Sequence, residues 1–160
     1  MAGTVAERGR IRRARPGEAA ALTALALRSK AHWPYDRAFM AVMRRVLKIT
    51  EEEIRAHHVL VHETGGVVDG VGALALFDDE WEVDHLWVEP AAIGRGIGRR
   101  LLDALLAKAA RLGAERVLVE ADPHAESFYA GYGAVRVGER PSSMIDGRSL
   151  PVLAIRLEAG

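Results

Sequence analysis

The chain has 160 residues, in which 22 Lys and Arg balance 22 Asp and Glu, so its formal net charge is zero. This balance removes any global electrostatic argument for a nucleic-acid partner or an anionic membrane surface. Cysteine is absent, which excludes disulfides, thiolate metal sites and a cysteine nucleophile.

The N-terminal ten residues are polar and lack the apolar core of a secretory signal. No run of 18 apolar residues suggests a membrane span. We therefore expect a cytoplasmic protein. Its length suits one hydrophobic core, so we predict a flexible tail over residues 1–9 and a single domain over residues 10–160.

The first elements predicted are a strand over residues 11–15 and helices over residues 18–29 and 36–48, where apolar residues recur at helical spacing. The arginines of the strand fit a solvated edge better than an anion-binding patch. Trp33 and Tyr35 lie in the loop between the helices. They either cap the core or line an acceptor pocket, since aromatics offer flat apolar walls with a polar tip.

Residues 57–63 and 67–77 are predicted to form two strands joined by a glycine hairpin. His58 and His62 alternate onto one face of the first of these strands. Four residues of strand span roughly 13 Å, which is too far for one metal ion. We therefore interpret both histidines as exposed polar residues and expect no metal site.

The next strand begins at Trp81 and ends before Pro90, which has no N–H for a sheet ladder. Because side chains alternate along a strand, Glu82 and Asp84 are expected to share one face, with His85 on the opposite face. This strand leads directly into a glycine-rich segment.

Gly94, Gly96 and Gly98 recur at every second residue between this strand and an amphipathic helix. Without Cβ atoms, their backbone can approach a ligand closely, and the first N–H groups of a helix have no internal partner. The segment thus favours a phosphate site, although the glycines could serve only to turn the chain. Neither a dinucleotide fingerprint nor a nucleoside-triphosphate loop fits the spacing.

The C-terminal half is predicted to contain a helix over residues 97–112 and a strand over residues 116–120, paired in parallel because a helix connects it to the preceding strand. Residues 135–139 and 150–157 are predicted to form an antiparallel pair. Between these two strands, residues 141–147 form a loop that could cover an acceptor site.

Two motifs resemble those of the GNAT superfamily of N-acetyltransferases. Arg95-Gly96-Ile97-Gly98 is similar to the family's acyl-CoA pyrophosphate loop, Gln/Arg-x-x-Gly-x-Gly/Ala, with Ile93 at the position of the usual Gln or Arg. Ala125-x-x-Phe128-Tyr129-x-x-x-Gly133-Ala134 resembles its second signature. The resemblance implies an α/β fold with a central mixed sheet, an antiparallel N-terminal meander, a parallel strand pair at the cofactor cleft, and flanking helices.

The resemblance also implies acetyl-CoA as the cofactor. The residues expected to bind it follow the strand end, the loop and the second signature: Leu86, Trp87, Val88, Gly94, Arg95, Gly96, Ile97, Gly98, Arg99, Arg100 and Phe128. At least one of the three arginines is expected to meet a phosphate. In relatives, the region of Trp33 and Tyr35 contributes to acceptor specificity, which favours these two residues as substrate-binding.

Acyl transfer to an amine needs a base and an acid. Deprotonating a lysine-like ammonium at pH 7 costs roughly 4–5 kcal/mol. Glu82 and Asp84 are the candidate bases, because neighbouring carboxylates raise one another's pKa. They could instead face solvent or attract a cationic acceptor. Tyr129 is the candidate acid toward the leaving thiolate, with a core aromatic as the alternative.

We therefore predict an N-acyltransferase that moves an acetyl group from acetyl-CoA to a primary amine of a small molecule or peptide, by direct attack in a ternary complex. A non-catalytic acyl-CoA sensor is the alternative, and a thioesterase-like hydrolase is the third candidate. The expected partner is the amine acceptor, with neither nucleic acid nor membrane. A homodimer through the last strands is compatible with the sequence.

Overall fold

A computed structural model describes residues 9–158. Most of the predicted tail, residues 1–8, lies outside the described residues. Gly9, the last residue of that tail, accepts a hydrogen bond at its carbonyl from Arg100 Nη2 at 2.9 Å.

Within the described range, the chain forms seven β-strands, five α-helices and two short 3-10 helices. In chain order they are β1 (Arg10–Arg13), α1 (Ala19–Ala31), α2 (Arg37–Val46), α3 (Glu51–Ala56), β2 (His58–Thr64), β3 (Val67–Phe77), β4 (Glu80–Val88), η1 (Pro90–Ala92), α4 (Ile97–Arg111), β5 (Arg116–Glu120), η2 (Pro123–Ala125), α5 (Glu126–Ala130), β6 (Val135–Pro141) and β7 (Ser149–Arg156).

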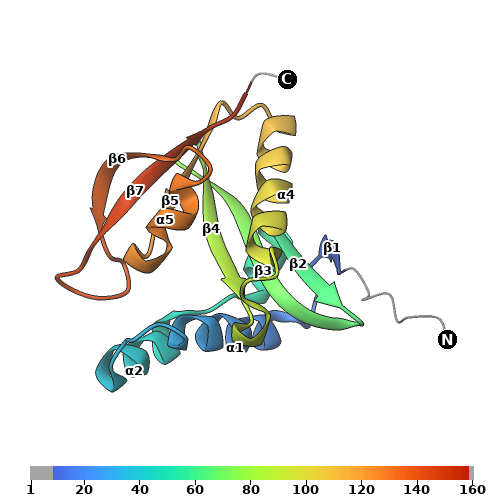
Figure 1. Cartoon of the computed structure of the whole chain (residues 1–160), viewed down its shortest axis with the longest axis vertical. Helices are drawn as coiled ribbons and strands as arrows, with labels where there is room; N and C mark the ends of the chain where they lie inside the picture. The colour runs from blue at the N-terminus through green and yellow to red at the C-terminus, as the bar shows by residue number, and fades with distance from the viewer. Residues whose placement is uncertain (1–8, 159–160) are drawn as a thin grey trace.

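The strands form one sheet in the order β1-β2-β3-β4-β5-β7-β6. The pair β4–β5 is parallel and the other neighbouring pairs are antiparallel, which confirms the predicted mixed sheet. Helices α1 and α2 cover one face, while α4 packs against β2, β3 and β4 on the other (Figure 1). The sheet thus separates two apolar layers.

Strands β4 and β5 pair only briefly before they part. Their register joins Glu82 to Leu118 and Val83 to Val119, and no pair follows in the described residues. The remainder of β4 therefore diverges from β5, as the ribbons of the two strands also show (Figure 1). At this opening, the C-terminal part of β4 has no neighbouring strand on its β5 side among the described residues.

A β-bulge lies in β4 where the opening begins. Val83 is opposite Leu74 and His85 is opposite Ala73, so Asp84 is the extra residue. A bulge places successive side chains on nearly the same side of a strand. The prediction that His85 points away from Asp84 is therefore wrong: His85 Nε2 lies 3.7 Å from Asp84 Oδ2.

Helix α4 lies unusually close to β3 because two glycines leave room for it. A Cβ atom at Gly70 would lie 2.7 Å from Ile97 Cγ2 and 2.9 Å from Leu101 Cδ1. At Gly72 it would lie 3.0 Å from Leu105 Cδ1. These glycines seat the apolar side of α4, and with it the first turn of the helix, against the sheet.

The predicted exposure of His62 is wrong. Its side chain is buried, with 2 % exposed, and its Nδ1 lies 2.5 Å from Asp69 Oδ1. Arg100 Nη1 lies 2.8 Å from the other ring nitrogen. Asp69, which pairs with the buried imidazole, comes from β3, and the pattern of β2 alone does not indicate such a partner.

β1 is an edge strand, as predicted, yet Arg12 is not solvated. Its guanidinium donates to Glu18 and Glu63, and only 15 % of its side chain is exposed.

Among the described residues, no helix has both the length and the apolar character needed to cross a bilayer.

Candidate active site

The glycine loop presents a row of backbone N–H groups. Gly94 and Gly96 have φ angles of 90° and 79°, and Gly96 precedes the first turn of α4. The N–H groups of residues 94–99 donate no hydrogen bond to any described residue. These donors at the positive end of a helix are suited to an anion such as a phosphate.

The three arginines beside the loop have different surroundings. Arg100 is held by His62 and by the Gly9 carbonyl. The guanidinium carbon of Arg99 lies 5.4 Å from the ring centre of Tyr132. Arg95 makes no hydrogen bond or ion pair with any described residue. The side chains of Arg95 and Arg99 therefore both keep their N–H donors for a ligand, whereas that of Arg100 does not.

Phe128 and Val88 meet at the loop. A Cβ at Gly98 would lie 3.6 Å from Val88 Cγ2 and 3.8 Å from Phe128 Cζ. Tyr132 Oη lies 3.0 Å from both the Arg99 carbonyl oxygen and Asp103 Oδ1, so it can donate to either, and this joins the segment after α5 to the first turns of α4. The two predicted signatures, about 30 residues apart, therefore converge on one spot.

Tyr129 has features of both sequence interpretations. It belongs to the buried core, with 5 % exposed, and its ring packs edge-on against Phe128 at 5.2 Å. Its hydroxyl donates no hydrogen bond to a described residue. Burial raises the pKa of Tyr129 above its usual 10.0, so the hydroxyl keeps its proton at neutral pH. It can therefore act as a donor.

The end of β4 offers backbone groups toward the opening. The Val88 N–H points to Ser29 Oγ at 3.4 Å rather than to β3. Alternation along the strand directs the Leu86 N–H to the same side, and the Trp87 N–H toward β3. Among Leu86, Trp87 and Val88, the predicted cofactor-binding residues of this strand, Leu86 is thus the one whose N–H faces the opening without a partner among the described residues.

A pocket lies beside the opening, between α2, β4, β5 and the segment after β6. Its lining residues come from six segments of the chain: Lys30, Met43, Leu47, Glu82, Val83, Asp84, Trp87, Glu120, Asp122, Ser142, Ser143, Met144, Arg148 and Leu150. Both predicted bases are among them. Ser142, Ser143 and Met144, from the segment predicted to cover an acceptor site, form part of the pocket wall.

One end of this pocket is acidic. Glu82 Oε1 forms an ion pair with Arg140 Nη1 at 2.7 Å, and Glu120 Oε2 lies 3.8 Å from the same nitrogen. Burial raises the pKa of Glu120, the charge of Arg140 opposes this, and the charges of Glu82 and Asp84 raise it further. The rise in pKa that neighbouring carboxylates cause, which was expected for Glu82 and Asp84, therefore acts on Glu120.

Asp84 lies between two histidines. Its Oδ2 is 3.9 Å from His57 Nδ1 and 3.7 Å from His85 Nε2, which is also 3.6 Å from Glu53 Oε2. Trp87 Nε1 donates to His85 Nδ1 at 3.0 Å. That bond selects the tautomer with its proton on Nε2, facing the carboxylates, so this nitrogen offers no lone pair to a metal ion.

The opposite end of the pocket is organised by Asp122. This carboxylate accepts hydrogen bonds from Lys30 Nζ and Tyr35 Oη, and Arg148 Nη2 lies 3.6 Å from it. Tyr35 therefore stands directly behind the pocket wall. Trp33 does not line the pocket: its ring stacks on His124, with centres 5.0 Å apart.

Four charged pocket residues escaped the sequence analysis: Lys30, Glu120, Asp122 and Arg148. Glu120 ends a strand predicted to be parallel and Asp122 follows it, and the carboxyl ends of such strands commonly carry functional groups. That signal was available for these two residues. Lys30 and Arg148 lie in a helix and a loop without a motif, so nothing local marked them.

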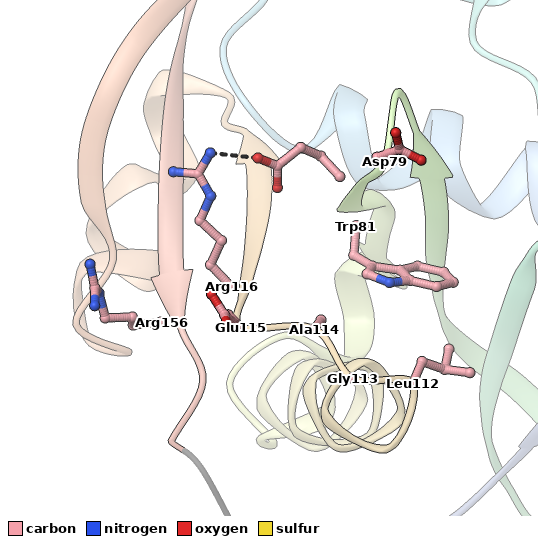
Figure 2. A pocket seen from close by; sticks show the side chains of 9 residues that line it. Asp79, Trp81, Leu112, Gly113, Ala114, Glu115, Arg116 and Arg156 are labelled. Atoms are coloured by element: carbon pink, nitrogen blue, oxygen red, sulfur yellow. Dashed lines mark hydrogen bonds and ion pairs between the residues drawn. The ribbon is translucent and has the colours of Figure 1, made fainter.

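A second depression lies at the other end of α4 (Figure 2). It is lined by residues around Leu112 and Gly113, and Arg116 closes one side through an ion pair with Glu80 at 2.5 Å. The glycine loop lies at the first turn of α4, whereas this depression lies at the last. It is therefore not part of the candidate active site.

Comparison with known proteins places this geometry in context. A family model described as an acetyltransferase (GNAT) domain matches residues 18–143. A GCN5-related N-acetyltransferase from Rhodopseudomonas palustris superposes with a TM-score of 0.80 at 24 % identity, covering 97 % of this chain and 99 % of that one.

Two further structures were solved with ligands. The PaiA N-acetyltransferase from Thermoplasma acidophilum, in complex with coenzyme A, has a TM-score of 0.76 at 17 % identity, covering 94 % of this chain and 99 % of that one. YncA from Salmonella typhimurium, with its cofactor acetyl-CoA, has a TM-score of 0.64 at 24 % identity, covering 96 % and 95 %. At these identities, the likeness establishes the fold.

Proposed function

The chain belongs to the GNAT acetyltransferase family, and from that premise we propose that it transfers an acetyl group from acetyl-CoA to a primary amine of a small molecule or peptide. Attack is direct, within a ternary complex. The observation that carries this proposal is the row of unpartnered N–H groups at residues 94–99, located where β4 leads from the acidic pocket into α4.

The residues present fit acetyl-CoA, which is the acyl donor of this family. The N–H groups of residues 94–99 would hold the diphosphate, and the positive φ angles of Gly94 and Gly96 keep side chains out of the way. Arg95 adds charge next to them. The Leu86 N–H faces the opening along which the acyl arm would lie. Bound there, acetyl-CoA supplies an activated thioester.

Proton removal from the acceptor is assigned to the acidic end of the pocket. Glu82 is committed to Arg140, whereas the pKa of Glu120 is raised by burial and by neighbouring charge. A carboxylate with a raised pKa is the stronger proton acceptor near neutrality. We therefore assign Glu120 as the base, with Asp84 beside it to attract the ammonium group and Glu82 to position Arg140.

Tyr129 is assigned as the acid. Its hydroxyl remains protonated and unpartnered, so it can give its proton to the departing sulfur as the new C–N bond replaces the C–S bond. Because the chain has no cysteine, an acyl-cysteine intermediate is excluded, so transfer is either direct or uses another nucleophile; direct attack by the amine is the route proposed here.

Release of free thiol from acetyl-CoA, measured with and without a broad panel of amines, tests the function. We expect release that depends on the amine, with the acetylated amine detected by mass spectrometry. Equal release with and without amine would indicate a hydrolase. Binding of coenzyme A without any release would indicate a sensor, and either result would contradict the proposal.

Substituting Tyr129 with Phe tests the acid. Loss of a general acid costs roughly 10²-fold or more in rate, so kcat of Y129F should fall by about that factor while the Kd for coenzyme A changes little. Tyr132→Phe is the matched control, because its hydroxyl bonds to α4 and not to the cleft. Unchanged turnover in Y129F would leave Tyr129 as a core aromatic only.

A further inference from the structure

The Asp122 end of the acceptor pocket carries an excess of positive charge. Two cations, Lys30 and Arg148, share the single carboxylate of Asp122. The exposed fractions of these side chains are only 8 % for Lys30, 15 % for Asp122 and 21 % for Arg148. A largely buried group with one cation too many is stabilised by any anion that can reach it.

Arg148 is the cation with donors to spare. Its Nη2 donates to Tyr35 Oη at 3.1 Å, while Nη1 and Nε donate to no described residue. The guanidinium carbon lies 5.1 Å from the Phe39 ring centre and 5.5 Å from that of Tyr35, so two aromatic rings pack beside the group. A fixed, planar guanidinium with free N–H groups matches a carboxylate in geometry.

The other end of the pocket has the opposite charge balance. Glu82 and Glu120 share one cation, Arg140, and the nearest partners of Asp84 are histidines. An ammonium group would be attracted there. Glu120 and Asp122 are two residues apart on an extended segment, so their Cα atoms lie roughly 6–7 Å apart and their side chains leave the same side of it. Such a spacing suits a short zwitterion.

The pocket wall also contains apolar side chains. Met43, Leu47, Met144 and Leu150 contribute side chains to the pocket wall. Methionine adapts to irregular apolar shapes, which suits a branched or flexible aliphatic group.

We propose that the acceptor is a free amino acid with an apolar side chain, whose carboxylate is bound by Arg148 and whose amine faces Glu120 and Asp84. This inference rests on the proposed acetyltransferase function and narrows its acceptor. Leucine is the probe, because its side chain matches the aliphatic wall. Isopentylamine, which lacks only the carboxylate, and leucinamide, which replaces it with a neutral amide, are the matched controls.

We expect kcat/KM for leucine to exceed that for isopentylamine and for leucinamide at least tenfold. In R148Q, the ratio of leucine to isopentylamine should fall about tenfold or more, the usual effect of losing a charge-assisted hydrogen bond. R148K, which keeps the charge but not the fork, should give an intermediate ratio. R136Q removes an exposed arginine of β6 and should keep the wild-type ratio.

Three outcomes would overturn the inference: preference for either carboxylate-free amine, an unchanged ratio in R148Q with wild-type coenzyme A affinity, or equal loss of all three substrates in R148Q. Transfer to carboxylate-free amines alone would leave the acetyltransferase proposal standing. Absence of amine-dependent thiol release across the broad panel would remove the proposed function itself.

Discussion

The glycine loop and the acceptor pocket both adjoin β4, but they are built from different parts of the chain. The loop offers the backbone N–H groups of six consecutive residues, 94–99. The pocket collects side chains from positions as distant as Lys30 and Leu150. A backbone site tolerates changes of side chain, whereas a side-chain site does not. Substitutions should therefore have large effects in the pocket and small effects at loop residues with side chains, such as Arg95, but not at Gly94 and Gly96, whose φ angles are positive.

The largest effect is expected for Asp122→Asn, because it leaves Lys30 and Arg148 buried without their counter-ion. Breaking a buried ion pair in this way typically costs about 3–5 kcal/mol of unfolding free energy. Urea denaturation at pH 7 measures it. The matched control is Asp146→Asn, at an exposed aspartate of the loop between β6 and β7, and it should leave the free energy of unfolding nearly unchanged.

The pH dependence of this difference follows from the pKa of Asp122. Burial alone would raise that pKa, but hydrogen bonds from Lys30 and Tyr35 outweigh burial and lower it below its usual 3.8. The stability that Asp122 contributes is therefore complete above about pH 4, and is lost as the pH falls through the folded-state pKa. The gap between wild type and D122N should narrow under acid conditions. A constant gap from pH 7 to pH 3 would contradict this reading.

A smaller but distinct effect is expected for Glu120→Gln. Removing a general base should lower kcat/KM by about 10²-fold and remove the acidic limb of its pH profile. Because the pKa of Glu120 is raised in the folded state, its ionised form opposes folding at pH values above that pKa. E120Q should therefore be more stable than wild type at pH 7. Glu115→Gln, an exposed control, should change neither quantity.

These two readouts separate a catalytic role from a structural one. A structural carboxylate would lose stability together with activity when replaced. If E120Q retains wild-type activity and the wild-type pH profile, the base lies elsewhere, with Asp84 as the next residue to test.

The smallest effect is expected in the loop. Arg95→Gln removes a side chain that makes no polar contact with described residues, and an exposed ionic contact is worth at most about 1 kcal/mol. The Kd for coenzyme A should rise only about two- to fivefold, with the difference shrinking in high salt. Calorimetric titration measures it. A loss of 10²-fold would mean that side chains, not backbone, hold the diphosphate.

The same contrast explains what could be predicted from the sequence. The loop follows from three glycines between a strand and a helix, so local chemistry was sufficient. The mixed sheet and its parallel pair followed from the family resemblance and from the helix between β4 and β5. The position of His85 was predicted wrongly, because the bulge at Asp84 interrupts the alternation of the strand and leaves no mark in composition.

The burial of His62 and the cluster around Asp122 depended on contacts between distant segments. His62 is accommodated by Asp69 and by Arg100, and Asp122 is joined to Lys30, 92 residues away. A local pattern carries no information on such pairs. Arg148 lies in a loop without a motif, so its free donors became visible only once the fold had brought it to the pocket.

The N–H groups of residues 94–99, which have no partner among the described residues, are proposed to bind the diphosphate of coenzyme A. Titration of the 15N-labelled protein with coenzyme A, followed in 1H–15N correlation spectra, tests it most directly. We expect the largest shifts on saturation at the amides of residues 94–99. Saturation that leaves these amides in place, or no binding at all, would contradict it.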